Sequence, residues 1–402
     1  MSTALPNTMS GGTKRKVSLN VAKELIKTQI LYSILDVGGE HVDSTAPSVY
    51  IEGTMGIGKS MIMRQVTEEV SSLLGVDMGF IDLRMAGMSG TDIQGIPVPI
   101  KEEGQDILVW IKDGLLPGIR NSDKKYGILF LDEVNQVEDT SVISLLYQLL
   151  LDKKMNDYTL PEGWTIVSAG NRAEDGGIYN RLPAPIRDRL LILEIKLNKE
   201  EWISWAKSQA THPAVITFVE SKYNGQEVLH TYDPEKELDG DEECSNYVFA
   251  TPRSWIQAST ELKKYESGAK IPNTNIELYS RETLSAALGG LLGDELAKVF
   301  ENFYSNSGNV DIYKYLNMGW VNASPLEEVG DLSREDLAYI ATVAEIHGNI
   351  EQKINVLYLL GYNNVNYLIK VLQDSLTIAE LEELKEHAIS NGNSSLLVSG
   401  NS

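Results

Sequence analysis

The stretch with the clearest chemical signature is GTMGIGKS, residues 53–60. It matches the phosphate-binding pattern G-x-x-x-x-G-K-S/T, with one further glycine inside the loop. Glycines let successive backbone N–H groups converge on phosphate oxygens, a lysine neutralises charge on the β- and γ-phosphates, and a hydroxyl can ligate Mg²⁺. The loop is therefore predicted to bind a nucleotide through Gly53, Thr54, Met55, Gly56, Ile57, Gly58, Lys59 and Ser60.

A pair of carboxylates, Asp132 and Glu133, follows the apolar run GILFL. Such a pair is typical of a solvated strand end when it stands alone. Downstream of a phosphate-binding loop, it lies where ligands bind in open α/β sheets, at the carboxyl ends of strands. Asp132 is therefore predicted to hold Mg²⁺ through water, together with Ser60, and Glu133 is predicted to polarise the attacking water.

Asn171 follows a further apolar run, WTIVSA at residues 164–169. An asparagine beside Gly170 is ordinarily a turn residue. At the end of a strand in the same sheet, its amide can hydrogen-bond both the γ-phosphate and the lytic water. Asn171 is therefore predicted to sense which nucleotide is bound.

The elements that must position these residues follow from the alternation of apolar runs. Five short runs, each of strand length, are separated by segments compatible with helices: residues 48–52, 79–84, 127–132, 164–169 and 190–195. This alternation predicts an α/β unit with a central, mostly parallel five-stranded sheet that is buried on both faces. Helical spacing at residues 19–35 predicts a helix packed on this unit, and helical patterns at 198–210, 212–223 and 251–267 follow it.

Composition limits the function classes. The chain has 402 residues, 42% of them hydrophobic, and a formal net charge of −22. That charge argues against a protein whose main task is to hold phosphate backbones. One cysteine, Cys244, allows neither an intramolecular disulfide nor a cysteine-based zinc cage. Neither a signal peptide nor an apolar run of membrane-spanning length is found, so we expect a cytoplasmic protein.

With these motifs in order, the chain resembles the MoxR-like branch of the AAA+ ATPases. The resemblance runs from about residue 20 to residue 265 and rests on FIDLRMAGMSGTDIQGIPVP (80–99), ILFLDEVNQ, YQLLLDKKMNDYTLPEGWTIVSAGNRAEDGG, RLPAPIRDRLLILEI and FATPRSW (249–255). It implies an ATPase core at 17–197 and a helical lid at 198–270. The residue pattern outside the resemblance predicts a flexible tail at 1–16 and a C-terminal helical region at 271–402 with a frayed end. The implied ligands are ATP and Mg²⁺.

The resemblance also assigns two arginines. Arg189, in IRDRL, corresponds to the arginine finger that reaches into a neighbouring subunit's site, and Arg187 is the rival candidate. The family segment usually ends in DRF, whereas Leu190 takes the last position here. Arg253, in ATPRSW, corresponds to the second sensor, which contacts the γ-phosphate from the lid. Pro252 is predicted to begin a helix, so that Arg253 lies in its first turn.

Residues 92–117 predict a hairpin, because the apolar segments IPVPI and DILVWI flank the polar turn KEEGQ. Two prolines in the first arm favour an edge position over the central sheet. In the MoxR-like branch such a hairpin can project towards the pore of a ring. The alternative is a surface hairpin that packs on its own domain.

An arginine that acts in a neighbouring site requires an oligomer, so the implied assembly is a ring, most simply a homohexamer. The family implies chaperone-like remodelling of a protein partner, including von Willebrand factor A-type proteins. Two alternatives stay open: a nucleic-acid motor or loader with the same ATPase core, and a scaffold that binds ATP without turnover. A basic pore hairpin would favour the motor, whereas Glu133, Asn171 and the two arginines disfavour the scaffold.

Overall fold

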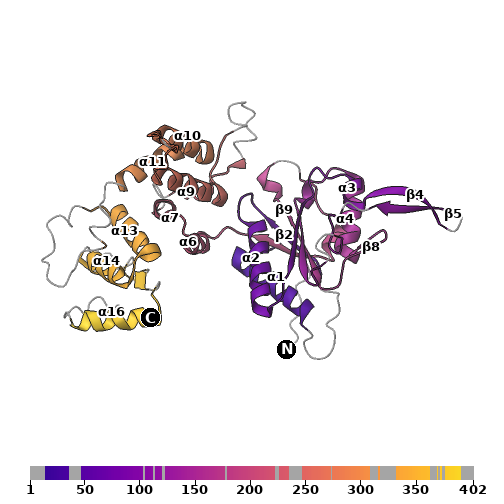
Figure 1. Ribbon diagram of the computed structural model, residues 1–402, viewed down its shortest axis with the longest axis horizontal. Helices are drawn as coiled ribbons and strands as arrows, with labels where there is room; N and C mark the ends of the chain where they lie inside the picture. Colours follow the sequence, from indigo (N-terminus) through magenta and orange to yellow (C-terminus); the bar gives the residue numbers. More distant parts are fainter. Residues whose placement is uncertain are drawn as a thin grey trace, which may run out of the picture. The chain divides into compact units, whose positions relative to one another are not determined.

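A computed structural model of the chain describes residues 14–35, 47–102, 105–111, 114–119, 123–176, 179–221, 226–234, 247–272, 274–307, 316, 332–362, 369, 372–373 and 376–390. The chain forms two compact units, Met1–Asn198 with Pro234–Gly240, and Lys199–Asp233 with Asp241–Ser402 (Figure 1). Cys244, residues 1–13 of the expected tail, most of the acidic stretch after residue 221 and the last dozen residues lie outside the described part.

A six-stranded parallel sheet is the centre of the first unit. Its strands, in spatial order, are β1 (Arg15–Val17), β10 (Leu191–Ile195), β2 (Val49–Gly53), β9 (Trp164–Gly170), β6 (Gly127–Asp132) and β3 (Gly79–Arg84). The predicted fold class, an α/β unit with a parallel sheet followed by helices, is confirmed.

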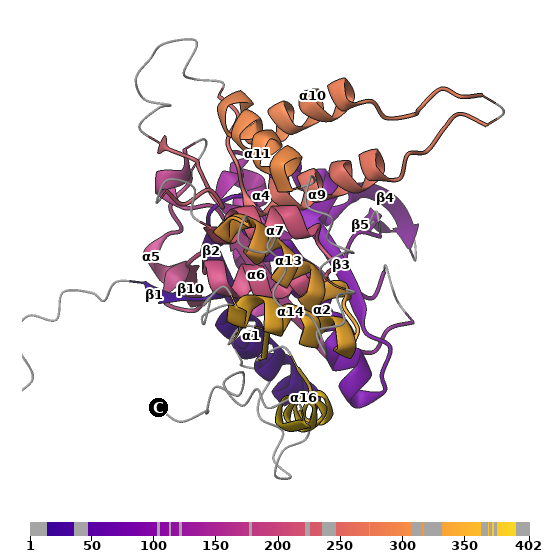
Figure 2. The same ribbon diagram turned by 90° about the vertical axis from the view of Figure 1, so that its left-hand side faces the viewer.

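The sixth strand, β1, corrects the sequence prediction of five strands and of a tail that extends to residue 16. Arg15 and Lys16 lie in β1, which pairs with β10 at the edge of the sheet (Figure 2). Lys16 forms an ion pair of 3.1 Å with Glu194 of β10. A three-residue strand with exposed basic side chains shows no apolar alternation, so the sequence pattern could not reveal it.

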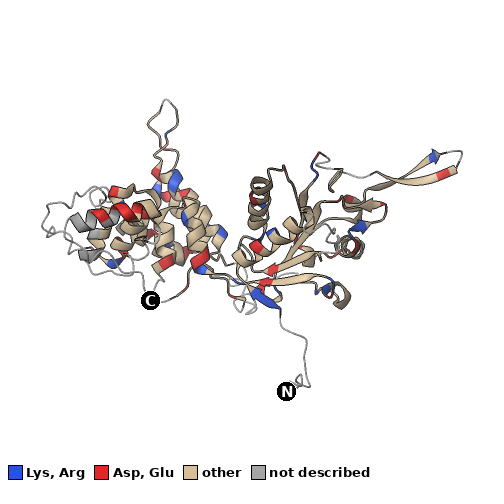
Figure 3. Cartoon of the chain, turned by 90° about the horizontal axis from the view of Figure 1, so that it is seen from below, with Lys and Arg blue, Asp and Glu red and all other residues tan. Residues whose placement is uncertain are grey.

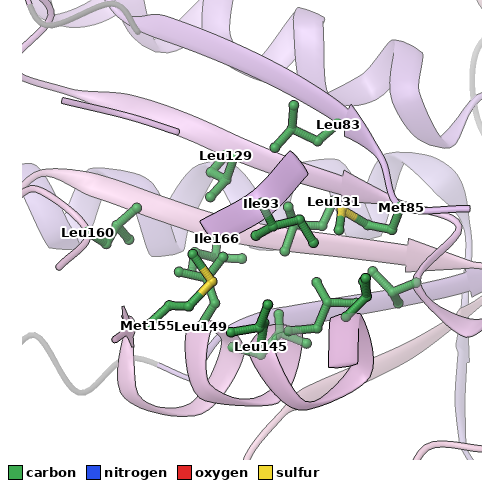
Figure 4. Close-up of a cluster of buried hydrophobic side chains, with 14 of the residues drawn as sticks. Leu83, Met85, Ile93, Leu129, Leu131, Leu145, Leu149, Met155, Leu160 and Ile166 are labelled. Atoms are coloured by element: carbon green, nitrogen blue, oxygen red, sulfur yellow. The ribbon is translucent and has the colours of Figure 1, made fainter. Parts of the chain in front are cut away.

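The sheet is covered by helices on both faces because side chains alternate along each strand. Ile128 and Phe130 of β6 pack with α1 (Leu19–Ile34) and α2 (Lys59–Leu74) on one face. Leu129 and Leu131 face the other way, towards α3 (Gly90–Gln94) and α4 (Thr140–Asp152). Figure 4 shows this second cluster, in which Leu145 and Leu149 lie against the sheet.

The predicted hairpin is confirmed as an antiparallel ribbon separate from the central sheet, formed by β4 (Ile96–Glu102) and β5 (Gln105–Ile111). Lys101 lies opposite Asp106, so charges of both signs occur on the ribbon (Figure 3). Shorter elements complete the unit: η1 (Val134–Gln136), β7 (Lys154–Met155), β8 (Tyr158–Thr159), η2 (Ala173–Asp175) and α5 (Ala184–Arg187).

The second unit is mainly helical in the part of it that the structure describes. Its longer helices are α6 (Lys199–Ser208), α7 (Pro213–Ser221), α9 (Pro252–Glu266), α10 (Arg281–Leu292), α11 (Asp294–Ser307), α13 (Arg334–His347), α14 (Ile350–Tyr362) and α16 (Ile378–Ser390). The rings of Phe218, Trp255 and Phe300 meet at centroid distances of 5.1–5.7 Å and join α7, α9 and α11. Of the described helices, none is both long and apolar enough to cross a membrane.

Candidate nucleotide-binding site

The loop 53–60 connects β2 to the first turn of α2. Gly56 and Gly58 have φ values of 70° and 110°, a region that side chains with a Cβ rarely adopt. Gly58 caps α2 without a side-chain hydrogen bond, so the backbone N–H groups of the first helical turn are not satisfied by a capping side chain. A glycine-rich turn that leads into the N-terminus of a helix has the chemistry of a phosphate-binding site.

Lys59 is buried and lies beside Asn171. Its Nζ donates hydrogen bonds to the Gly53 and Thr54 carbonyl oxygens at 2.6 and 3.2 Å. It also donates to Asn171 Oδ1 at 3.0 Å. The structure thus brings together two residues that are far apart in the sequence.

Ser60 and Asp132 also meet, since Ser60 Oγ donates to Asp132 Oδ2 at 3.0 Å. The other carboxylate oxygen, Asp132 Oδ1, accepts the Glu133 N–H at 3.0 Å. A hydroxyl and a carboxylate in contact are hard oxygen donors of the kind that Mg²⁺ binds. The residues present therefore fit a magnesium ion.

Glu133 has an unusual backbone conformation, with φ 60° and ψ 31°. It caps the short helix η1, and its carbonyl accepts the Gln136 N–H at 2.9 Å. A left-handed conformation costs a residue with a Cβ roughly 1–2 kcal/mol. Such strain is concentrated at functional sites, because it persists only where the surroundings impose it.

Asn135 is a site residue that the sequence reading missed. Its side chain is 1% exposed and holds the backbone of Asn171 on both sides. Asn135 Nδ2 donates to the Asn171 carbonyl at 2.7 Å, and Asn135 Oδ1 accepts the Asn171 N–H at 3.2 Å. In the sequence, Asn135 is simply a polar residue between Val134 and Val137. Nothing in the local pattern distinguishes it from an ordinary turn asparagine.

Glu52, immediately before the loop, was also missed. It is 2% exposed, forms an ion pair with Lys14 and accepts a hydrogen bond from the Tyr179 hydroxyl at 3.2 Å. Burial, and then the charge of Glu52, raise the pKa of the neighbouring Tyr50 well above its usual value. These contacts attach residues 14 and 179 to the strand that leads into the loop.

Asp82 adds negative charge beside Asp132. Burial, followed by repulsion from Asp132, raises the pKa of Asp82, and Arg64, which lies 3.4 Å from it, opposes this change. Within the described ranges, His, Cys, Asp and Glu residues form no group of three that could hold a metal ion. A cation at Ser60 and Asp132 would thus depend on ligands beyond these side chains.

The two candidate finger residues differ in exposure. Arg189 is exposed just beyond α5. Arg187 is half-buried, and its Nε is buried without a hydrogen-bond partner. An arginine that serves a neighbouring subunit must be accessible, so exposure favours Arg189.

Arg253 belongs to the second unit, where it is exposed in the first turn of α9. Pro252 begins this helix, as predicted. Thr251 caps it, because its hydroxyl accepts the Ser254 N–H at 3.1 Å. The capping arrangement fixes the helix end that carries Arg253.

No family model and no curated protein matches the sequence. The solved structures that resemble the chain include two examples. One is a RuvB point mutant from Thermotoga maritima, with 16% identity over 73% of this chain and 78% of that chain and a TM-score of 0.35. The other is a Cytophaga hutchinsonii protein proposed to be an ATPase, with 14% identity over 70% of this chain and 88% of that chain and a TM-score of 0.30.

Proposed function

We propose that this protein is an AAA+ ATPase of the MoxR-like branch that hydrolyses ATP and uses the energy to remodel or assemble a protein partner in the cytoplasm. One observation carries the proposal. Residues from three separate segments, the loop 53–60, Asp132 and Asn171, converge through direct hydrogen bonds at the ends of adjacent parallel strands.

Phosphate binding would use the residues of the loop. The backbone N–H groups at the start of α2 and the Lys59 ammonium supply positive charge, and Lys59 would exchange a carbonyl partner for a phosphate oxygen. Ser60 and Asp132 would hold Mg²⁺, which neutralises charge on the phosphates when it is bound.

Hydrolysis would use Glu133 and Asn171. Glu133 lies next to Asp132 and has a carboxylate that can accept a proton from water as the water attacks the γ-phosphorus. The Asn171 amide, which now accepts from Lys59, can orient that water or a γ-phosphate oxygen. The bond that breaks joins the γ-phosphorus to the bridging oxygen, and ADP and phosphate leave.

Assembly into a ring, most simply a homohexamer, would complete each site. Arg189 of one subunit would stabilise charge on the γ-phosphoryl group in its neighbour, which in other phosphate-transfer enzymes is worth about 10³–10⁵ in rate. Arg253 would contact the γ-phosphate from the helical lid. Motion of the lid between nucleotide states would change the interfaces and act on the bound partner.

The β4–β5 ribbon supports a protein partner over nucleic acid. Ile96 and Leu108 are exposed on it, and its charges are of both signs. Exposed apolar side chains suit contact with a protein surface. Contact with the phosphates of a nucleic acid would instead require a ribbon with a net positive charge. A von Willebrand factor A-type protein would be one such partner, and the nucleic-acid motor is the rival function.

ATP turnover measured over a range of protein concentrations tests the proposed function. If sites are shared between subunits, turnover per subunit should rise with concentration and reach a plateau, whereas a site within one subunit gives a constant value. Stimulation by DNA would support the motor, and absence of turnover at every concentration would support a scaffold.

Lys59→Ala tests the loop in the same assay. We expect ATP binding, measured by calorimetry, to weaken by at least about 100-fold, because the variant loses a buried charge contact to the phosphates. Lys125→Ala, which removes a surface lysine of the same unit, is the matched control and should bind normally. Unchanged ATP affinity of Lys59→Ala would contradict the assignment.

A further inference from the structure

Asn135 occupies a buried position between the carboxylate pair and the end of β9. Its side chain makes the two hydrogen bonds to the Asn171 backbone described above, one as donor and one as acceptor. An asparagine that satisfies both the N–H and the C=O of one residue replaces the pairing that a neighbouring strand would provide. The peptide groups on either side of Asn171 are thereby fixed.

The backbone of Asn135 is held as well. Its carbonyl accepts the Asn180 N–H at 2.7 Å, and the Asn180 side chain donates to the Val137 carbonyl at 2.7 Å. Asn135 therefore connects the segment after Asp132, the end of β9 and the segment that leads into α5. The contact with Asn180 uses the main-chain carbonyl of Asn135, so it does not depend on the type of residue at position 135.

Gly170 gives an independent indication that this arrangement is tight. A Cβ at position 170 would lie 2.5 Å from Asn135 Oδ1 and 2.3 Å from the Tyr50 hydroxyl oxygen. Both distances are shorter than real Cβ contacts, so the amide and the phenol occupy the space that any other residue would need. The close approach of Asn135 to β9 thus depends on a glycine before Asn171.

We propose that Asn135 is a positioning residue for ATP hydrolysis, which acts by fixing the backbone from which the Asn171 side chain reaches Lys59 and the γ-phosphate. This inference rests on the proposed ATPase function. With its backbone fixed at both peptide groups, Asn171 retains only side-chain rotation, so its amide can pass between the Lys59 ammonium and a phosphate without a search over backbone conformations.

The consequence for kinetics is specific. Asn135 does not contact Lys59 or the loop 53–60 in any described hydrogen bond, so its loss should affect turnover more than nucleotide binding. For Asn135→Ala we expect kcat to fall about 10- to 100-fold with the ATP dissociation constant changed less than about threefold, because displacements of about 1 Å at a reacting group cost rates of that order.

A double-mutant cycle separates positioning from general damage. Asn171→Ala removes the amide but leaves the backbone groups that Asn135 binds. If Asn135 acts through the Asn171 side chain, the double variant should turn over ATP no more than about threefold more slowly than Asn171→Ala alone. If the turnover of the double variant instead falls by the product of the two single-variant losses, the proposal is wrong.

Asn355→Ala is a matched control, since Asn355 is a buried asparagine of the second unit whose Nδ2 donates to the Leu316 carbonyl at 2.8 Å. It should leave kcat unchanged, although it too loses a buried side-chain hydrogen bond. An equal loss of kcat in both variants would also overturn the proposal.

Amide hydrogen exchange of the nucleotide-free protein tests the contact without any need for turnover. The Asn171 N–H should exchange at least about 10-fold faster in Asn135→Ala than in the wild type, because its acceptor is lost, while Asn355→Ala leaves it unchanged. An unchanged rate in Asn135→Ala would refute the positioning role. Absence of wild-type turnover, with exchange accelerated as expected, would instead refute the proposed function and leave the contact established.

Discussion

Glu133 combines the carboxylate that we propose as the general base with a left-handed backbone. The bond from its N–H to Asp132 Oδ1 and the bond from Gln136 N–H to its carbonyl together impose the conformation. Substitutions that keep the side-chain shape should preserve this local geometry, since the strain belongs to the backbone.

Glu133→Gln should therefore keep ATP binding and lose hydrolysis. An amide cannot accept the proton from water, and loss of a general base costs about 10²–10⁴ in rate. Single-turnover measurements with labelled ATP would show the loss, and size-exclusion chromatography in ATP should show the assembled ring persisting.

The exposed neighbour Glu138 offers a matched control, because Glu138→Gln removes a carboxylate from the same segment. Hydrolysis should be unchanged in that variant. Rapid hydrolysis by Glu133→Gln would remove Glu133 from the role of base.

The sequence predicted four side chains that the structure brings into pairwise hydrogen-bond contact, but it did not reveal the residues that hold them. Lys59, Ser60, Asp132 and Asn171 are recognisable because their chemistry requires particular residue types after strands or within a glycine-rich turn. Asn135, Glu52 and Tyr179 contribute through contacts between segments 36–127 residues apart, and no local pattern marks such contacts.

Among the elements, α1 and α2 are connected by a small charge cluster as well as by their apolar faces. Glu69 of α2 accepts hydrogen bonds from Lys23 and Lys27 of α1 at 2.7 and 3.0 Å. The hydrogen bond from Lys23, followed by the one from Lys27, lowers the pKa of Glu69 below its usual value of 4.5, although burial opposes this shift. The cluster attaches α1 to the helix that begins at Lys59.

Replacing Glu69 by Gln should cost about 0.5–1 kcal/mol of unfolding free energy at neutral pH, a range typical of partly exposed ion pairs. A carboxylate with a lowered native pKa stabilises the fold above its usual pKa, and this contribution is lost as the pH falls through the native value. The difference from wild type should thus shrink steadily below about pH 4.5.

Urea unfolding at several pH values would measure this difference. The matched control is Glu68→Gln, which changes an exposed neighbouring carboxylate. A stability difference for Glu69→Gln that is constant from pH 7 to about pH 3 would show that the ion pairs are not its cause.

The elements themselves were largely predictable because most are long or continuously apolar. The five predicted strands all occur within one residue of the expected ends, and the proline at the start of α9 is where the sequence placed it. β1 was missed because its pairing depends on the edge of β10 and on Lys14 reaching the buried Glu52.

At the scale of the whole molecule, the proposed site is divided between subunits. Arg189 is exposed in the first unit and has no role in binding the nucleotide of its own chain under the proposal. A variant that lacks Arg189 therefore retains an intact loop, and a variant that lacks Lys59 retains an intact finger. The two defects affect different sites of one assembly.

Mixtures of Arg189→Ala and Lys59→Ala subunits should recover part of the ATPase activity that each variant lacks alone. Some mixed interfaces combine a working loop with a working finger, so in a random hexamer roughly a quarter of interfaces can be active at equal proportions. The activity of mixtures at several ratios measures this recovery, with co-assembly verified by cross-linking.

Absence of recovery in co-assembled mixtures would move the assignment to Arg187 or to an arginine that acts within its own chain. The same mixtures prepared with Lys125→Ala in place of Lys59→Ala should simply follow the proportion of Arg189-containing subunits.

The short strand β1 has a consequence for the solubility of the protein. β10 carries the apolar sequence LILEI, and without β1 its outer backbone N–H and C=O groups would be free to pair with another chain. β1 occupies those groups and presents Arg15 and Lys16, whose like charges repel a second copy. Removal of residues 14–17 would thus create an aggregation-prone edge, and it would also remove Val17, which packs against the core beneath the sheet.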